Sequence, residues 1–207
     1  MSGNRRAGAG HRVGIVLAAG EGRRMGGPKA VLELRGTPLV TYAVRTALNG
    51  GCERVLVVLG AGAELAKPHA EAAGAQVVVN RRWAEGMGGS LDAGLSMAAS
   101  VAPAATAAMV LLVDQPYITA PAVAAVFSAQ QDPEDARILA AAAYEGRRGH
   151  PLLIGREHWP ALRATLTGDE GAAAFLHEHR NAIILVPCDT IADPHDLDLP
   201  ADLPRQN

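Results

Sequence analysis

Short apolar runs alternate along the chain with longer stretches of helical spacing. The apolar runs cover residues 13–18, 55–59, 77–79, 109–113 and 138–140. Because these runs are continuous, they predict strands that are buried on both faces, as in a parallel sheet. The stretches between them predict helices over residues 38–48, 63–73, 90–100 and 120–130. Strands that alternate with helices indicate βαβ units and therefore an α/β fold with a mostly parallel sheet.

The pattern changes after residue 144. Residues 145–149 predict a turn between strands at 140–144 and 151–154, and this hairpin adds a small antiparallel edge to the sheet. The remaining predicted elements are helices over residues 157–164 and 170–177 and a strand over 183–186. No internal repeat or long linker divides the sequence. We therefore expect a single domain over residues 1–207, with residues 1–11 and 204–207 flexible.

Composition excludes several classes of protein. Hydrophobic residues make up 49% of the 207 positions and charged residues 19%, which excludes disorder driven by low hydrophobicity. The net charge of -2 argues against a nucleic-acid binder, and no apolar run reaches the roughly 18 residues of a membrane span. The first residues lack the apolar segment of a secretory signal, and Cys52 and Cys188 form no metal-binding pattern. We expect a cytoplasmic protein that acts on small molecules.

A glycine-rich loop follows the first predicted strand, where residues 17–29 read LAAGEGRRMGGPK. Glycines let backbone N–H groups converge on an anion, and Arg23, Arg24 and Lys29 supply positive charge for phosphate oxygens. A plain turn with solvated basic residues is the alternative. Pro28 interrupts the Gly-Lys pair of a P-loop, and the glycine spacing is one residue too long for a dinucleotide fingerprint.

The loop resembles the signature L-A-x-G-x-x-x-R-M-G-x-x-K of nucleotidyltransferases that activate phosphorylated acceptors. The chain looks similar to the MobA-like NTP transferases, and among them most like the molybdenum cofactor cytidylyltransferases. This resemblance implies a three-layer α/β/α sandwich with a Rossmann-like sheet, and a loop that wraps the triphosphate. Arg24 and Lys29 are the implied catalytic residues. The implied nucleotide-binding residues of the loop are Leu17, Ala18, Ala19, Gly20, Glu21, Gly22, Arg23, Arg24, Met25, Gly26 and Lys29.

A second glycine-rich stretch, residues 80–94, leads into a predicted helix near Ser90. As the cap of that helix, Ser90 would mark an N-terminus that favours an anion or a polar base edge; a cap behind a flexible lead-in is the alternative. The stretch resembles the family segment P-x-W-x-x-G-M-x-x-S-L-x-x-G, which lines the nucleobase pocket. The implied base-side residues are Gly86, Met87, Gly88 and Ser90, and the G-M and S-L pairs favour the cytidylyl branch.

Two aspartates are candidate ligands for Mg²⁺. Asp114 directly follows a buried strand, at the sheet edge where α/β proteins bind ligands, although an Asp there can also cap a turn. The resemblance places a metal-binding aspartate in such a D-Q-P motif. Residues 196–203 resemble the family tail D-x-D-T-P-x-D-L, in which Asp196 and Asp198 point the same way. We expect Asp114 and Asp198 to bind the metal; a solvated acidic tail is the alternative.

Three residues are expected on the acceptor side of the site. Gln115 belongs to the D-Q-P motif, His150 to a G-x-P hairpin and Asp169 to an element that resembles G-D-x-G-A-R. Ala173 stands in place of the arginine of that element, which bears on the identity of the acceptor. The alternatives are a partly exposed turn histidine at His150 and, at Asp169, the N-cap of a helix that begins at Glu170.

Taken together, the resemblance implies transfer of CMP from CTP to a phosphorylated acceptor, with Mg²⁺ as cofactor and release of pyrophosphate. The expected acceptor is the molybdenum cofactor, with a molybdoenzyme as possible recipient of the product and with no nucleic-acid or membrane partner. One alternative is another phosphorylated acceptor, such as a sugar, a polyol or a phospholactate. The other is a nucleotide-binding accessory protein without turnover.

Overall fold

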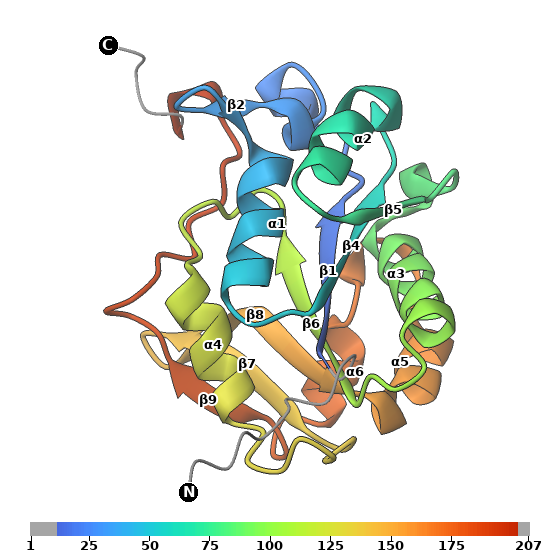
Figure 1. Cartoon of the computed structure of the whole chain (residues 1–207), viewed down its shortest axis with the longest axis vertical. Coiled ribbons are helices and arrows are strands. Elements are labelled where there is room, and N and C mark those ends of the chain that lie inside the picture. The colour runs from blue at the N-terminus through green and yellow to red at the C-terminus, as the bar shows by residue number, and fades with distance from the viewer. Residues whose placement is uncertain (1–11, 203–207) are drawn as a thin grey trace, which may run out of the picture.

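A seven-stranded sheet forms the centre of the computed structural model, which describes residues 12–202 (Figure 1). The flexibility expected of residues 1–11 and 204–207 concerns positions outside the described residues. The strands lie in the order β5-β4-β1-β6-β8-β7-β9. Their bounds are β1 (Arg12–Ala18), β4 (Arg54–Leu59), β5 (Gln76–Val79), β6 (Ala107–Leu112), β7 (Leu139–Tyr144), β8 (Arg147–Gly155) and β9 (Ile184–Pro187). The short strands β2 (Glu33–Leu34) and β3 (Thr37–Pro38) pair separately as an antiparallel sheet.

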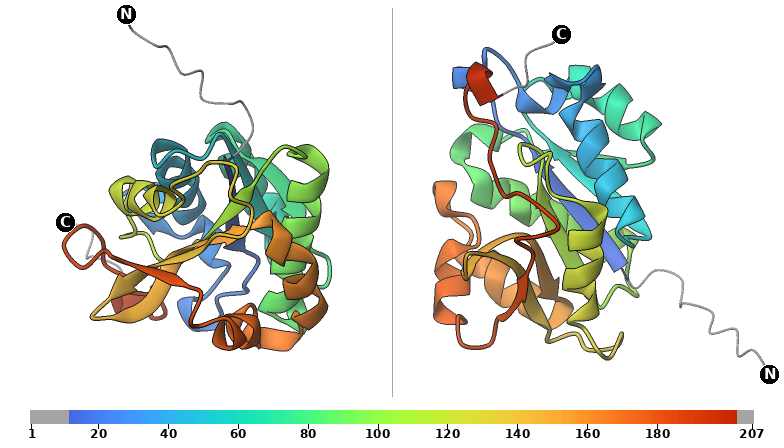
Figure 2. Two further views of the ribbon diagram at one scale, coloured as in Figure 1. Left: turned by 90° about the horizontal axis from the view of Figure 1, so that it is seen from below. Right: turned by 90° about the vertical axis from the view of Figure 1, so that its left-hand side faces the viewer.

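Helices cover both faces of the sheet, as the views in Figure 1 and Figure 2 show. One face carries α1 (Leu39–Asn49), α2 (Ala63–Ala72) and α4 (Ala120–Ser128), whose apolar residues form one core cluster with the sheet. The other face carries α3 (Met87–Val101), α5 (Trp159–Thr165) and α6 (Ala173–Glu178) in a second cluster. The predicted α/β class and its three layers are confirmed.

Only β8 runs against the other strands of the sheet. It pairs antiparallel with both β6 and β7, while β9 pairs parallel with β7. The antiparallel strand therefore lies inside the sheet, and β9 forms the edge. The turn between β7 and β8 is shorter than the predicted 145–149, because Glu145 and Gly146 both have positive φ (51° and 73°) and make a two-residue hairpin turn.

Helix α3 begins at Met87 rather than at Ser90, with Gly86 as its N-cap. The prediction that Ser90 caps this helix is wrong: Ser90 lies inside the first turns and is buried. The close packing of α3 on β1 depends on Gly94, because a Cβ there would lie 2.7 Å from Cγ2 of Ile15. This packing brings the middle of α3 close to the middle of β1.

The segment before α6 also differs from prediction. Residues Gly168–Glu170 form a 3₁₀ turn, η5, with Thr167 as its N-cap, and α6 begins only at Ala173. The helix cannot begin at Glu170, because Gly171 has φ 53° and ψ -127°, which is not a helical conformation. The prediction that Asp169 caps a helix beginning at Glu170 is therefore wrong.

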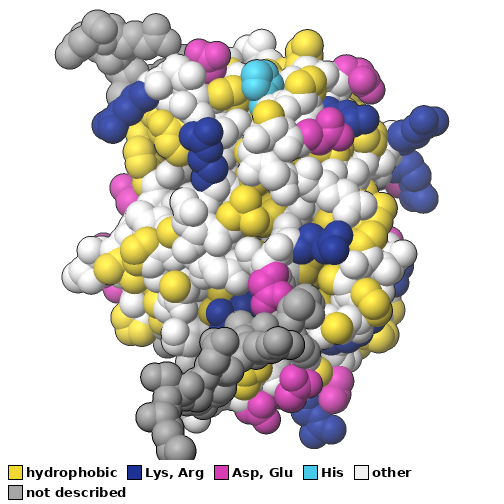
Figure 3. Space-filling view, viewed as in Figure 1, with side chains coloured by type: hydrophobic (Ala, Val, Ile, Leu, Met, Phe, Trp, Pro, Cys, Tyr) yellow, Lys and Arg dark blue, Asp and Glu magenta, His cyan; other side chains and the backbone are white. Residues whose placement is uncertain are grey.

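Charged side chains are mixed on the surface. On the face shown in Figure 3, the described Lys and Arg side chains are interspersed with acidic, apolar and small residues. Among residues 12–202, no helix is both long enough and apolar enough to cross a bilayer.

Candidate active site

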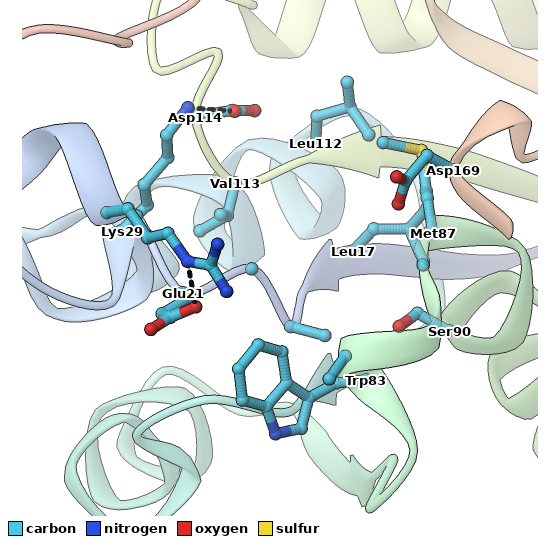
Figure 4. A pocket seen from close by; sticks show the side chains of 16 residues that line it. Leu17, Glu21, Lys29, Trp83, Met87, Ser90, Leu112, Val113, Asp114 and Asp169 are labelled. Carbon is cyan, nitrogen blue, oxygen red and sulfur yellow. Dashed lines mark hydrogen bonds and ion pairs between the residues drawn. The ribbon is translucent and has the colours of Figure 1, made fainter.

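A cavity of about 470 Å³ opens at the carboxyl ends of β1 and β6. Its walls come from the loop after β1, the 3₁₀ turn η3 (Trp83–Glu85), the start of α3, the residues after β6, and η5 (Figure 4). This end of a parallel sheet is where α/β proteins bind ligands. The predicted nucleotide-binding residues that line the cavity are Leu17, Ala19, Gly20, Glu21, Gly22, Arg23, Lys29, Gly86, Met87 and Ser90.

The remaining predicted nucleotide-binding residues lie around the cavity rather than in its wall. Ala18, at the end of β1, and Met25, in the middle of the loop, are both buried. Gly88 packs against η5, since a Cβ there would lie 3.0 Å from the backbone nitrogen of Thr167. Arg24 is exposed, and its charge is among those that lower the pKa of Asp198.

The glycine-rich loop folds back on itself through a single 3₁₀ turn, η1 (Arg23–Met25). Gly22 and Gly26 flank this turn in the left-handed conformation, with φ of 61° and 81°. A Cβ on Gly22 would lie 2.1 Å from the carbonyl oxygen of Gly27, so no other residue fits that position. Gly20 is exposed and has open space where a Cβ would be, which leaves backbone accessible beside the cavity.

Lys29 lies between the two predicted metal ligands. Its Nζ donates to Oδ2 of Asp114 and to Oδ1 of Asp198, each at 2.7 Å. Lys29 follows the loop in the 3₁₀ turn η2 (Lys29–Val31), Asp114 follows β6, and Asp198 comes from the tail after β9. The side chain of Lys29 is 16% exposed, whereas that of Asp198 is 52% exposed. The fold thus brings together three predicted residues that are far apart in the sequence.

The electrostatics of this cluster favour charged side chains. Burial alone would lower the pKa of the Lys29 ammonium, but the hydrogen bonds and negative charges of Asp114 and Asp198 outweigh burial and raise it. The hydrogen bond from Lys29 lowers the pKa of the Asp198 carboxyl. Both groups are therefore ionised at neutral pH, which is the state that binding of phosphate and metal requires.

The chemistry of Asp114 and Asp198 fits a divalent cation. Their carboxylates reach one common point, which the ammonium of Lys29 occupies. Within residues 12–202 no three His, Cys, Asp or Glu side chains form a metal-binding group. Two carboxylates, with water and phosphate oxygens in the other positions, are the usual ligands of Mg²⁺ at nucleotide sites. A metal here would be held by Asp114 and Asp198 and would supply positive charge for phosphate oxygens, as the ammonium of Lys29 would.

The three predicted acceptor-side residues lie in different environments. Gln115 is buried, and its Nε2 donates to Oδ1 of Asp196 at 2.8 Å. His150 is part of β8 and is partly buried near Asp114, and this burial lowers its pKa to about 4. Asp169 lines the cavity together with the base-side residue Met87, as Figure 4 shows.

Sequence reasoning missed Trp83, which lines the cavity, and Asn80, which lies behind the wall and contacts Ser90. Trp83 is partly exposed in the wall, where Gly60 makes room for it: a Cβ on Gly60 would lie 2.4 Å from that of Trp83. Asn80 is buried, and its Nδ2 donates to the Oγ of Ser90 at 3.1 Å. The tryptophan of the P-x-W segment could have identified Trp83 from the sequence. No sequence pattern indicates the buried hydrogen bond of Asn80.

The low pKa of His150 predicts acid sensitivity. The folded protein keeps His150 neutral down to about pH 4, whereas an unfolded histidine binds a proton near pH 6.5. Stability is therefore lost as the pH falls from 6.5 to 4, by up to about 3 kcal/mol. We expect His150→Gln to flatten this part of the pH profile in urea unfolding. His177→Gln, at an exposed position of α6, is the control and keeps the wild-type slope; a wild-type slope in His150→Gln would contradict the prediction.

The three-layer fold, the glycine-rich loop and the lysine between two aspartates together define a nucleotidyltransferase. Comparison with known families agrees with this class. The model of the MobA-like NTP transferase domain matches residues 14–183, and the chain belongs to this family. The family predicted from the sequence is thereby confirmed.

Similar proteins have more than one activity. Nicotine blue oxidoreductase of Paenarthrobacter nicotinovorans is 36% identical, over 89% of this chain and 91% of that protein. Molybdenum cofactor guanylyltransferase of Rhodobacter capsulatus is 31% identical, over 93% of each chain. Among solved structures, the manganese complex of Rv0371C from Mycobacterium tuberculosis matches with a TM-score of 0.73 and 26% identity, over 93% of this chain and 95% of that one.

Proposed function

We propose that this nucleotidyltransferase of the MobA-like family transfers CMP from CTP to the terminal phosphate of the molybdenum cofactor and releases pyrophosphate. The observation that carries the proposal is the position of Lys29, between Asp114 and Asp198 at the mouth of the glycine-rich loop. One site then offers a cation for the phosphates and a carboxylate pair for a divalent metal. The proposal includes Mg²⁺ as that metal, and the manganese complex of a similar protein supports a divalent ion.

In the proposed reaction an oxygen of the acceptor phosphate attacks the α-phosphorus of CTP. The new P–O bond forms as the bond to the β-phosphate breaks, and pyrophosphate leaves with that electron pair. Mg²⁺, when bound, would neutralise charge on the triphosphate and the leaving group. Lys29 and Arg24 bind and orient phosphate oxygens, while Asp114 and Asp198 hold the metal. The acceptor phosphate is already ionised, so no general base is needed.

The part of the cavity wall formed by the start of α3 is suited to a nucleobase. Leu17 and Met87 provide apolar surface there. The Oγ of Ser90 accepts a hydrogen bond from Asn80, so its own hydrogen is left to donate. A donor in this wall suits a carbonyl acceptor such as O2 of cytosine, and the resemblance to the cytidylyl branch makes CTP the proposed nucleotide.

The cysteines and the proposed reaction indicate the cellular compartment and the partners. We place it in a reducing, cytoplasmic compartment, in keeping with two buried free cysteines, Cys52 and Cys188. The proposed partners are CTP and the acceptor, and a molybdoenzyme is the proposed recipient of the product.

An oxidoreductase is the second candidate, because a relative with that name is 36% identical over most of both chains. The cluster of Lys29, Asp114 and Asp198 weighs against it, since hydride transfer does not require a carboxylate pair for a metal. The absence of the family arginine at Ala173 favours a different phosphorylated acceptor more than a different reaction.

A thermal-shift panel with Mg²⁺ and CTP, GTP, ATP or UTP tests the proposed nucleotide. Ligand at 100 times its dissociation constant adds about 2.7 kcal/mol of stability, which corresponds to a Tm increase of roughly 5–10 °C for a chain of this size. We expect this shift with CTP, and a smaller one with the other nucleotides. A larger shift with GTP would replace CTP in the proposal, and a shift with NADH or NADPH but no NTP would favour the oxidoreductase.

A further inference from the structure

The tail after β9 runs back along the side of the sheet toward the glycine-rich loop, as the right-hand view of Figure 2 shows. Several hydrogen bonds tie it to the body of the protein. The Oγ1 of Thr119 donates to the carbonyl of Ile191 at 2.7 Å, and the backbone nitrogen of Leu197 donates to the carbonyl of Asp114 at 2.9 Å. The tail is therefore what carries Asp198 to Lys29.

Gln115 holds the part of this tail that directly precedes Leu197 and Asp198. Its Nε2 donates to Oδ1 of Asp196 at 2.8 Å and to the carbonyl of Pro194 at 3.3 Å. Gln115 directly follows Asp114, so one short segment after β6 provides a predicted metal ligand, an acceptor for Leu197 and a donor for Asp196. Gln115 is itself buried, which limits competition from water for its amide.

The side chains of residues 196–198 point alternately to the two sides of the tail. Leu197 is fully buried in the core cluster on the face of the sheet that carries α1, α2 and α4, while Asp196 bonds Gln115 and Asp198 bonds Lys29. In an extended segment residues two apart point the same way. A fixed Asp196 side chain therefore fixes the orientation of this segment about its own axis. That orientation places the Asp198 carboxylate at the cation position.

We propose that Gln115 and Asp196 form a clasp that positions Asp198, so that Asp196 acts on the metal site through the tail and is not itself a metal ligand. This inference rests on the proposed function, because it assigns Asp198 to the metal. It gives Gln115 a positioning role in place of the predicted contact with the acceptor. Positioning residues behind a metal ligand are typically worth 10-fold to 100-fold in metal affinity.

A pair of exchanged side chains tests the clasp. Gln115→Glu places a carboxylate against Asp196 and removes the donor, and we expect it to weaken binding of Mn²⁺ with CTP at least about tenfold, measured by electron paramagnetic resonance. Combining it with Asp196→Asn restores one hydrogen bond with its direction reversed, at unchanged net charge. Recovery to within about threefold is expected. Wild-type affinity in the single variant, or no recovery in the double variant, would overturn the clasp.

Two further measurements distinguish a loss of the clasp from a general loss of stability and from a failure of the proposed function. Thr119→Val removes the tail contact at Ile191 and an N-cap bond of α4, so it lowers the Tm of the protein but leaves Mn²⁺ affinity unchanged. Hydrogen exchange at the Leu197 amide needs no metal: faster exchange in Gln115→Glu, reversed in the double variant, supports the clasp. If wild-type protein binds no Mn²⁺ with CTP, the proposed function fails, and the exchange data alone then decide the clasp.

Discussion

Replacing Lys29 by methionine is expected to lower turnover by roughly 100-fold to 1000-fold, the usual cost of removing one charge that stabilises a transition state. Methionine keeps much of the length and apolar stem of lysine but cannot donate to the phosphates. Steady-state pyrophosphate release with saturating nucleotide measures this effect. The only other lysine of the chain, Lys67, pairs with Glu71 on the surface of α2 at 3.9 Å, and Lys67→Met is the matched control.

The same variant is expected to change metal binding in the opposite direction. Without the ammonium, Asp114 and Asp198 face each other with no cation between them. Mn²⁺ in the absence of nucleotide should therefore bind more tightly to Lys29→Met than to wild type. Weaker binding of Mn²⁺ to the variant, or unchanged turnover, would contradict the role assigned to Lys29.

Asparagine at position 114 is expected to lower turnover by about 100-fold or more, because it removes one of two carboxylate ligands while keeping the shape of the side chain. Lys29 loses the more buried of its two partners but keeps its charge, so CTP should still bind. Because one carboxylate ligand is gone, the binding of CTP should depend less on Mg²⁺. A titration of Mg²⁺ at fixed CTP measures this dependence. Asp132→Asn, at an exposed loop position, is the control. Wild-type dependence on Mg²⁺ in Asp114→Asn would remove Asp114 from the metal site.

Much of the fold was predictable because local signals agreed with the tertiary structure. The apolar runs of β1, β4 and β6 are buried on both faces, as continuous runs predict. Thr119, directly before the helix predicted over 120–130, caps α4, with its Oγ1 accepting from the nitrogen of Ala122. The errors lie where glycines conceal helix boundaries. Residues 86–89 resemble a loop in sequence, yet contacts with η5 hold most of them in the first turn of α3.

The candidate site was predictable only in part. The glycine-rich loop is a local feature, and its phosphate chemistry can be inferred from Gly22, Arg24 and Lys29 alone. Asp198 lies 84 residues beyond Asp114, and no spacing rule brings the two together; the family resemblance suggested the pair. The Gln115–Asp196 bond has no sequence signal, because it depends on the path of a tail with little regular structure. Tertiary contacts of segments without regular structure cannot be predicted from the periodicity of hydrophobic residues.

Release of pyrophosphate from CTP tests the central claim most directly. Wild-type protein is incubated with Mg²⁺, CTP and the molybdenum cofactor, and pyrophosphate and the cytidylylated product are measured together. We expect the two in equal amounts, with neither formed without acceptor and both formed roughly 100-fold to 1000-fold more slowly by Lys29→Met. No pyrophosphate from CTP, GTP, ATP or UTP with this acceptor or with sugar, polyol or lactate phosphates would contradict nucleotidyl transfer, and oxidation of NADH or NADPH by the same preparation would assign the site to redox chemistry.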